Sequence, residues 1–514
     1  MTEKDQAQRT MRLQKTRLPS VLYTAEQTRS LDRAAIDGGV PGFRLMQRAA
    51  QTAFQALLKR WPRLQKITLF CGGGNNGGDG LVMAVLAHQH GLAVQVLTVG
   101  DNYAERLSGE ALDAWRMLTA EGIDTAPFKY GVSMHGELIV DAMLGTGLKG
   151  SVRGIYQQAI RSVNSCGLPV LAVDTPSGVC ADTGAILGDA VIADVTVSFI
   201  GLNRGLLTHQ AVDHVGELQF DDLRVADEAY EQVPVNLFRT TEEDLRERLR
   251  PRARNAHKGS NGRILVVGGD LGLGGAALIA SQAAARCGAG LISLATRSEH
   301  VPASLIRCPE VMAKGVRGGQ DLQPMLDNAD VIVIGPGLGQ GAWAEQLLRE
   351  VLSTDKPLVL DADALNLISS HSTMADAQRD NWVLTPHPGE AGRLLDESTA
   401  ALQADRFAAV ARLQQRYGGV AVLKGAGSLV DDGETQFLCS AGNPGMATGG
   451  MGDMLSGIIG ALLAQGLSLS DSARLGVFVH ATAADLCVGR QGERGLLATD
   501  LLFELPGLLN GLDR

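Results

Sequence analysis

Apolar residues in the first half of the chain occur in short, β-rich runs that are separated by segments of helix length. The runs are KITLF, VQVLTV, LIVDAM, PVLAVD and VTVSFI, all between residues 66 and 200. This alternation is typical of a parallel sheet with crossover helices. Ahead of it, Thr24 and Gln27 have the spacing of a capping box, which predicts a helix through SLDRAAIDGG, and FRLMQRAAQTAFQALLKRW predicts a second helix.

The alternation restarts after a charged segment between residues 225 and 260, in which no compact β pattern is visible. The later runs are RILVVGG, LISLAT, VIVIGPG, PLVLDADAL, WVLTPHPGE and VAVLKGAG. We expect most of the charged segment to be a solvated helix and a linker. The sequence therefore predicts an amino-terminal tail over residues 1–20, one α/β domain over 21–234 and a larger α/β domain over 235–514.

Composition restricts the function more than the fold. The chain has 514 residues, 63 of them glycine, and 45% of its residues are apolar, which is typical of a soluble α/β protein with many tight loops. A net charge of -10 argues against nucleic-acid and anionic-membrane partners. Seven cysteines without a CxxC pair and no secretory signal favour reduced thiols and a cytoplasmic location. GIIGALLAQGL is too short to span a membrane and predicts a buried helix.

The segment CGGGNNGGDG, residues 71 to 80, combines a phosphate-binding pattern with a residue that opposes phosphate. Gly72, Gly74 and Gly77 fit GxGxxG between a predicted strand and a predicted helix. Asp79 would repel a phosphate unless a cation or a sugar hydroxyl lies between them. Alternatively, Asn75, Asn76 and Asp79 supply only turn and helix N-cap chemistry.

Further polar residues follow the other predicted strands of this half. Asp141 and the loop GTGLKGS with Lys149 follow LIV, and Asp174 with Ser177 follows VLAV. Ligands of parallel sheets bind beyond the carboxyl ends of the strands, so these side chains are expected to converge. Oxygens of Asn76, Asp141 and Ser177 are suited to a hard cation such as potassium. The simpler alternatives are a solvated loop lysine at Lys149 and an Asp174 that only fixes the turn before Pro176.

YTAEQTRSLDRAAI, GGGNNGGDG, DAMLGTGLKG and DTPSG together resemble the NAD(P)H-hydrate epimerase (YjeF amino-terminal) family, over about residues 20 to 220. The resemblance implies a Rossmann-like, three-layer domain that epimerises hydrated NADH and NADPH. It implies catalysis by Asp174 with Lys149 and a potassium ion bound by Asn76, Asp141 and Ser177. Thr175 departs from the usual DIPSG. The hydrate-binding residues that it implies are Asn75, Asn76, Gly77, Gly78, Asp79, Gly145, Thr146, Gly147, Leu148, Lys149, Gly150, Ser151 and Asp174.

In the second half, NPGMATGGMGDMLSGIIGALL joins a glycine-rich turn to an apolar helix. Backbone N–H groups at such a helix start form an anion site, where Asp453 could take a proton from an acceptor hydroxyl. Alternatively, Asp453 is an ordinary N-cap. The chain contains no GxxxxGK[ST] pattern, which excludes P-loop chemistry.

This arrangement resembles the ribokinase superfamily. HKGSNGRILVVGGDLGLGGA, GPGLG, DADALN, TPHPGE and KGAGS are similar to the ADP- or ATP-dependent NAD(P)H-hydrate dehydratase (YjeF carboxy-terminal) family, over about residues 240 to 512. The resemblance implies a ribokinase-like α/β domain with Asp453 as general base. The hydrate-binding residues implied are Ala276, Gly337, His387 and Asp453, and the nucleotide-binding residues are Lys424, Gly425, Ala426, Gly427, Ser428 and Gly452.

Each of these assignments has a simpler alternative. His387 is otherwise a packed or exposed histidine, and Lys424 a strand-end lysine at the surface. His257 and Lys258 either cover the nucleotide phosphates or belong to the linker, and Ser428 replaces the usual threonine but keeps its hydroxyl.

Together the two resemblances imply a bifunctional repair enzyme. Its first domain interconverts the R and S hydrates, and its second dehydrates the S form to NAD(P)H, using ADP with magnesium and releasing AMP and phosphate. The expected partners are the hydrates NADHX and NADPHX, an adenine nucleotide and a second copy of the chain as a homo-oligomer, but no nucleic acid and no membrane. The alternatives are a ribokinase-like kinase of a vitamin precursor fused to a nucleotide-binding module, and a ligand-binding protein without turnover.

Overall fold

The computed structural model describes residues 18–370 and 377–511. It divides into two compact units, the first ending at Val235 and the second beginning at Asn236. The predicted tail, residues 1–20, lies outside the described residues except for its last three positions. Within the described residues, no helix combines the length and apolarity needed to cross a membrane.

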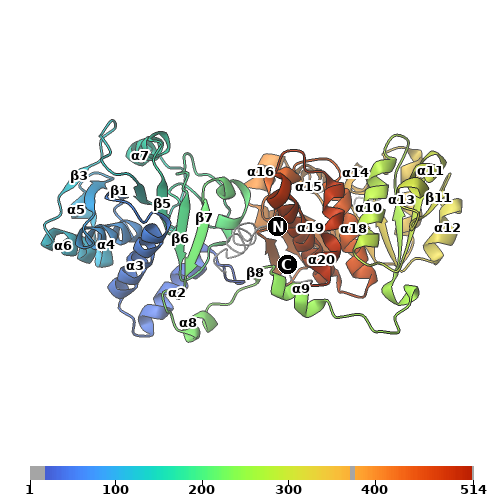
Figure 1. The fold of residues 1–514 in the computed structure, drawn as a ribbon, viewed down its shortest axis with the longest axis horizontal. Helices are drawn as coiled ribbons and strands as arrows, with labels where there is room; N and C mark the ends of the chain where they lie inside the picture. The colour runs from blue at the N-terminus through green and yellow to red at the C-terminus, as the bar shows by residue number, and fades with distance from the viewer. Residues whose placement is uncertain (1–17, 371–376, 512–514) are drawn as a thin grey trace. The chain divides into compact units, whose positions relative to one another are not determined.

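The first unit is built on a seven-stranded parallel sheet, in the order β3-β2-β1-β4-β5-β6-β7. Its strands are β1 (Lys66–Cys71), β2 (Ala93–Thr98), β3 (Thr125–Pro127), β4 (Ile139–Ala142), β5 (Val170–Val173), β6 (Val195–Phe199) and β7 (Glu217–Asp221). Its helices are α2 (Ala25–Asp37), α3 (Gly42–Arg60), α4 (Asn75–Gln89), α5 (Tyr103–Arg106), α6 (Gly109–Ala120), α7 (Gly154–Ser165) and α8 (Asp227–Glu231), with 3₁₀ turns η1 (Arg204–Leu207) and η2 (His209–Asp213). Figure 1 shows this order of elements.

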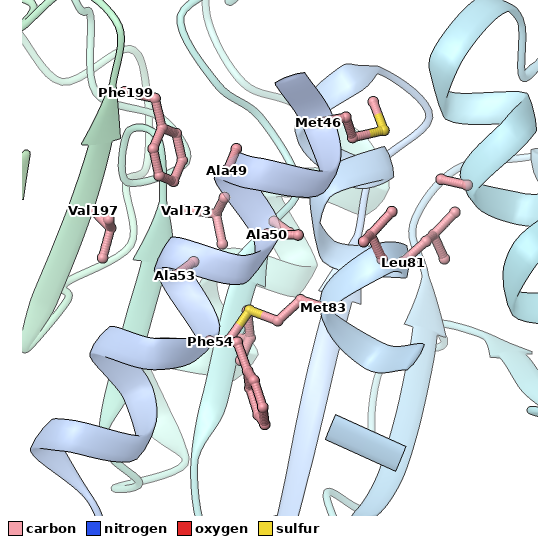
Figure 2. Packing of buried hydrophobic residues seen from close by; sticks show 14 of the residues in the cluster. Met46, Ala49, Ala50, Ala53, Phe54, Leu81, Met83, Val173, Val197 and Phe199 are labelled. Atoms are coloured by element: carbon pink, nitrogen blue, oxygen red, sulfur yellow. The ribbon is translucent and has the colours of Figure 1, made fainter. Parts of the chain in front are cut away.

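Helices cover both faces of this sheet, because side chains of each strand alternate between two apolar clusters. In β1, Ile67 and Leu69 belong to the cluster with α3, α4 and α6, whereas Phe70 belongs to the cluster with α7. In Figure 2, α3 crosses the sheet with Ala49, Ala50 and Ala53 near Val173 and Val197. Small side chains on this helix face allow the close approach. The predicted Rossmann-like, three-layer architecture is confirmed.

The amino-terminal helices begin as the sequence predicts. Thr24 and Gln27 form the complete capping box of α2, with the side chain of each bonded to the backbone N–H of the other. The second predicted helix is α3.

The second unit contains a ten-stranded sheet, in the order β11-β10-β9-β12-β13-β14-β15-β16-β17-β8. Its strands are β8 (Leu237–Arg239), β9 (Arg263–Val267), β10 (Leu291–Thr296), β11 (Met312–Gly315), β12 (Val331–Ile334), β13 (Leu358–Leu360), β14 (Trp382–Leu384), β15 (Val420–Leu423), β16 (Ser428–Asp431) and β17 (Gln436–Cys439). Only β16 runs antiparallel to its neighbours. The sheet and its covering helices confirm the ribokinase-like α/β prediction.

The helices of this unit follow the strands in alternation as far as β15. They are α9 (Glu242–Arg248), α10 (Gly274–Arg286), α11 (Val301–Arg307), α12 (Gly319–Asp327), α13 (Ala342–Leu352), α14 (Ala362–Ser370), α15 (Pro388–Leu395), α16 (Thr399–Ala404), α17 (Arg406–Tyr417), α18 (Met451–Ala464), α19 (Leu469–Gln491) and α20 (Leu505–Leu509). The 3₁₀ turns are η3 (Lys258–Asn261), η4 (Ser298–His300), η5 (Pro444–Met446) and η6 (Ala498–Phe503). The helix predicted from GIIGALLAQGL forms most of α18, which is buried.

One expectation about the charged segment is wrong. Residues 225 to 260 do contain a strand, β8, which pairs in parallel with β17 at the edge of the sheet. Leu237 aligns with Gln436, about two hundred positions further along the chain. The rest of the segment includes the predicted helix, α9. A three-residue strand has no readable period of its own, so its distant partner determines its conformation.

Candidate active sites

The glycine-rich segment after β1 leads directly into α4, and close backbone packing requires two of its glycines. A Cβ at Gly72 would lie 1.9 Å from the carbonyl oxygen of Met143, and one at Gly77 would lie 1.6 Å from the carbonyl oxygen of Gly72. Gly74 has open space around it. The glycines therefore bring the first turn of α4 against the end of β4, so that its polar side chains lie over the strand ends.

Those polar side chains do not cap the helix. Gly74 is the N-cap of α4, and no side-chain cap hydrogen bond is formed. Both amide atoms of Asn76 are buried and have no hydrogen-bond partner among the described residues. The alternative that assigned Asn75, Asn76 and Asp79 to turn and cap chemistry is therefore wrong. A buried amide without a partner is a group that a ligand, an ion or a water molecule would satisfy.

Asp141 and Ser177, from the ends of β4 and β5, form a buried hydrogen-bonded pair. The Ser177 hydroxyl donates to Asp141 Oδ1 at 2.6 Å, and the Ser177 backbone N–H donates to Oδ2 at 2.8 Å. The hydroxyl also accepts from the backbone N–H of Leu144 at 2.9 Å. Burial raises the pKa of Asp141 to about 6, although the hydrogen bonds from Ser177 and Met143 lower it.

Asp174 directs its carboxylate to the glycine loop that follows β4. Its backbone has a φ of 67°, in the left-handed region, and its Oδ2 accepts from the Thr146 backbone N–H at 2.9 Å. A Cβ at Gly145 would lie 2.5 Å from this Oδ2 and 3.3 Å from Asn76 Cβ, so the three residues meet at one point. Burial raises the Asp174 pKa to about 6. Because its carboxylate binds another loop, Asp174 does more than fix the turn before Pro176.

Thr175, the residue at which the chain departs from the family motif DIPSG, is expected to lower the stability of the fold. Thr175 is fully buried, and its hydroxyl has no hydrogen-bond partner among the described residues. An apolar side chain at this position would avoid the desolvation of that hydroxyl.

Two residues near this site were missed by the sequence analysis. Burial raises the pKa of Asp79 well above its ordinary value, and the charges of Asp174 and of Asp32, on α2, add to this shift. Burial, Asp174 and Glu110 in turn raise the pKa of Asp32 to about 6. The hydroxyl of Tyr156, on α7, accepts from the Gly73 backbone N–H at 3.5 Å. Asp32 lies within the motif YTAEQTRSLDRAAI, which could have identified it, but Tyr156 lies in no recognised motif.

The structure does not pair Lys149 with Asp174. Lys149 is exposed and has neither an ion pair nor a hydrogen bond with any residue in the described ranges. The loop from Gly145 begins beside Asp174 and ends with Ser151 beside Gly188. The part of Lys149 in catalysis stays a prediction.

In the second unit, Asp453 lies in the first turn of α18 with a free carboxylate. The N-cap of this helix is Gly450, which has a φ of 89°, so Asp453 is not the N-cap. Its carboxylate has no hydrogen bond to the described residues. Burial and then the charge of Asp361 raise the pKa of Asp453, Lys424 opposes them, and the net value is about 7. A carboxylate with this pKa can accept a proton near neutral pH.

Lys424 is not a surface lysine. Its ammonium lies 2.8 Å from Asp361 Oδ1 and 3.9 Å from Glu390 Oε2, and its side chain is only 19% exposed. Burial lowers the Lys424 pKa, but Asp361 and Glu390 raise it above its ordinary value overall. Lys424 therefore remains charged beside the start of α18.

The loop from Lys424 to Ser428 is held in shape by residues on both of its sides. The Ser428 hydroxyl donates to the Gly425 carbonyl at 3.0 Å and accepts from the Gly425 N–H at 3.2 Å. Beneath the loop, buried Arg406 donates to the carbonyl oxygens of Leu423 and Lys424, both at 3.3 Å. Sequence analysis missed Arg406, since an arginine in a helix has no distinguishing local pattern. The loop is thus preformed for an anionic ligand.

The four predicted hydrate-binding residues follow strand ends, either in the loop after a strand (Gly337) or at the start of a helix (Ala276 in α10, His387 at α15 and Asp453 in α18). A Cβ at Gly337 would lie 3.1 Å from Ala276 Cβ, so these two residues are adjacent. His387 is the N-cap of α15, and its Nδ1 accepts from the N–H groups of Gly389 and Glu390 at 3.0 and 3.3 Å. Because Nδ1 accepts, the neutral ring carries its proton on Nε2, which lies 3.3 Å from Glu390 Oε1.

His257 and Lys258 lie at the opposite edge of the sheet. They begin η3, directly before β9, and Gly290 fits against the Lys258 carbonyl with no room for a side chain. Nearby Gly262 packs against Ala464, at the end of α18 remote from Asp453. Fourteen residues of helix separate the two ends by about 20 Å. The alternative that they cover the nucleotide phosphates is therefore not supported, and they belong to the linker.

Comparison with known proteins agrees with both halves of this description. Residues 42–205 match the family model described as YjeF-related protein N-terminus, and residues 264–506 match that of NAD(P)H-hydrate dehydratase. The bifunctional NAD(P)H-hydrate repair enzyme Nnr of Coxiella burnetii is 49% identical over 492 residues, which are 96% of this chain and 100% of that protein. Nnr of Escherichia coli is 43% identical, over 98% and 96% of the two chains. A ribokinase-like superfamily protein of Enterococcus faecalis is 31% identical with a TM-score of 0.50, covering 54% of this chain and 96% of that one.

A Rossmann-like unit with buried carboxylates above a glycine loop and a ribokinase-like unit with an anion site at a helix start define a two-domain, nucleotide-dependent enzyme. The chain belongs to the family of bifunctional NAD(P)H-hydrate repair enzymes. This confirms the predicted family and the predicted union of an epimerase with a nucleotide-dependent dehydratase. Membership of this family argues against the two alternatives, a kinase of a vitamin precursor and a ligand-binding protein without turnover.

Proposed function

We propose that the first unit interconverts the R and S hydrates of NADH and NADPH, and that the second unit dehydrates the S form with ADP. The β-phosphoryl group of ADP passes to the hydrate hydroxyl, giving AMP. The phosphate then leaves with the C–O electron pair while the ring nitrogen donates its lone pair, and loss of a ring proton restores the double bond. The observation that carries this proposal is the match over the whole length of the Coxiella burnetii repair enzyme, with Asp453 free at the start of α18.

In the first unit, we assign proton transfer at the hydroxylated ring carbon to Asp174. Its raised pKa and its position beside Gly145 support this role, because inversion beside a ring nitrogen requires the hydroxyl to leave or the ring to open. Lys149, from the exposed loop, would steady developing negative charge. The hydrate would lie between the first turn of α4 and the loop from Gly145 to Ser151.

The residues present fit a potassium ion. Asn76 supplies a buried amide oxygen without a partner, and Asp141 and Ser177 add a carboxylate and a hydroxyl. An all-oxygen donor set of this kind suits a hard cation. When bound, the ion would supply fixed positive charge beside the hydrate's phosphates.

In the second unit, Asp453 would take the proton of the hydrate hydroxyl as the phosphoryl group arrives. Ala276, Gly337 and His387 would hold the hydrate. Lys424 to Ser428 and Gly452 would hold ADP, which we expect to bind with magnesium. The seven free cysteines support the proposed cytoplasmic location, and the homo-oligomer stays a prediction.

The test uses the two hydrate epimers separately, each with ADP or with ATP, and follows the near-ultraviolet absorbance of the reduced nicotinamide. We expect the S form to be repaired directly with ADP and the R form to be repaired through the first unit. Absence of absorbance recovery with either nucleotide would contradict the proposal. In Asp174→Ala, repair of the S form should continue while repair of the R form falls to its spontaneous rate.

A further inference from the structure

We propose that Asp361 is a positioning residue of the dehydratase site, whose carboxylate fixes the Lys424 ammonium at the start of α18 as the charge that meets the transferred phosphoryl group. This inference rests on the proposed function and deepens it. It gives a role in the reaction to Asp361, the first residue of the motif DADALN. Lys424 would bind the phosphoryl group, and Asp361 would act on that group through Lys424 without touching it.

The two residues come from strands that are not neighbours. Asp361 directly follows β13 and Lys424 directly follows β15, with β14 between them in the sheet. Asp361 Oδ1 lies 2.8 Å from Lys424 Nζ. Asp361 is 1% exposed, so solvent hardly screens this pair. The contact therefore fixes the end of a flexible lysine side chain in one position.

The second carboxylate oxygen of Asp361 links the pair to α18. It accepts from the Ser456 hydroxyl at 2.6 Å, and the same hydroxyl lies 2.9 Å from the Gly452 carbonyl. A Cβ at Gly452 would lie 3.2 Å from Lys424 Nζ and 3.5 Å from Asp361 Oδ2. The ammonium is thus held directly beside the first turn of α18, where backbone N–H groups can bind an anion.

The charges around Asp361 explain why its carboxylate stays ionised. Burial raises its pKa, but Lys424 and the hydrogen bonds from Lys424, Ser456 and Thr385 lower it below its ordinary value overall. Glu390 also faces the ammonium from α15, at the longer distance of 3.9 Å. The direct contact and the hydrogen bond to α18 distinguish Asp361 from Glu390 as the residue that sets the position of Lys424.

The same geometry gives Asp361 a measurable influence on the general base. Burial contributes most to the raised pKa of Asp453. The charges of Asp361, Asp363 and Glu390 also raise it, whereas Lys424 lowers it. In Asp361→Asn the charge of Asp361 is removed, so Asp453 should ionise at lower pH. The acid limb of the pH profile of kcat should then move to lower pH, although the variant turns over more slowly. A carboxylate that only stabilised the fold would not move that limb.

The experiment measures dehydration of the S hydrate, ADP binding and thermal unfolding for Asp361→Asn, Lys424→Met, the double variant and Ser456→Ala. We expect Asp361→Asn to lose about 100-fold in kcat/KM for ADP, the loss typical when one partner of a buried charge pair is removed. The loss should be much smaller in the Lys424→Met background, since Asp361 acts through Lys424. Ser456→Ala, which leaves the ion pair in place, should lose about 10-fold in kcat. Asp321→Asn changes a half-buried carboxylate on α12 that pairs with exposed Arg317, and this control should match the wild type in dehydration.

Two results would overturn the inference while the wild type still repairs the hydrate. One is a folded Asp361→Asn with kcat within about threefold of wild type and an unmoved acid limb. The other is equal loss from Asp361→Asn in both backgrounds. If Asp361→Asn does not fold, Ser456→Ala decides, and wild-type turnover in that variant would refute the role. A wild type without repair activity refutes the proposed function instead.

Discussion

The two units both place buried carboxylates at the carboxyl ends of parallel strands, but they balance the charge differently. In the second unit, Asp361 contacts the Lys424 ammonium and its pKa is lowered. In the first unit, Asp79, Asp141 and Asp174 form no ion pair within the described residues, and burial raises the pKa of each. In the part of the chain that the structure describes, the second site therefore pairs its carboxylate with a cation, whereas the carboxylates of the first site have no paired cation.

This difference indicates what each site requires from outside. A carboxylate paired with a fixed ammonium is ionised before any ligand binds. A group of unpaired, buried carboxylates must take up protons or gain positive charge from a ligand. The comparison therefore supports a cation requirement in the epimerase and a preformed anion site in the dehydratase.

The largest effect is expected from Asp453→Asn. This variant removes the carboxylate that is both the proposed general base and an unpaired acid of the second unit. Dehydration of the S hydrate should fall by about 10³-fold. The variant should also unfold at a higher temperature. In the wild type, ionisation of a carboxylate whose pKa is raised to about 7 destabilises the folded state. The measurements are the absorbance assay and thermal unfolding as a function of pH.

The pH dependence of that stabilisation has a definite sign. In the unfolded chain Asp453 ionises near pH 4, and in the folded chain near pH 7. Between these values the folded state binds the proton more strongly, so wild-type stability falls as pH rises. The advantage of Asp453→Asn should be absent below pH 4, grow between pH 4 and 7, and reach about 1 to 4 kcal/mol above pH 7. An advantage that is independent of pH would contradict the assigned pKa shift.

The next effect concerns the point where Asp174, Asn76 and Gly145 meet. In Gly145→Ala, the new Cβ would lie 2.5 Å from Asp174 Oδ2 and must displace the carboxylate. We expect epimerisation to fall by about 100-fold, the size of loss that a displacement of about 1 Å can cause, while dehydration of the S form is unchanged. Gly147→Ala lies in the same predicted hydrate-binding loop, but a Cβ there has open space, so its loss should be much smaller than that of Gly145→Ala. Equal activity in both variants would show that the Asp174 position is not critical.

The sequence predicted the parts of each site that lie within one motif, but not the contacts between motifs. The capping box of α2 and the turn into α18 depend on residues three or four positions apart, so local patterns were sufficient for them. The Asp361–Lys424 pair depends on β14 lying between β13 and β15, and strand order cannot be derived from local sequence. Asp32 was missed because an aspartate in an amphipathic helix is usually solvent-exposed. Arg406 was missed for the similar reason that its acceptors come from another element.

The smallest effect tests whether the first unit also leaves neutral polar groups unpaired. The buried Thr175 hydroxyl has no partner in the described part of the chain, so Thr175→Val should raise the unfolding free energy by about 1 kcal/mol. Thr196→Val is the matched control on β6. Its equally buried hydroxyl donates to the Val215 carbonyl at 2.8 Å, so this variant should lose about 1 kcal/mol. Chemical denaturation of both variants measures the difference. Equal destabilisation of both variants would mean that a bound water or ion forms a hydrogen bond with the Thr175 hydroxyl. The first unit would then contain fewer unpaired buried polar groups than its carboxylates suggest.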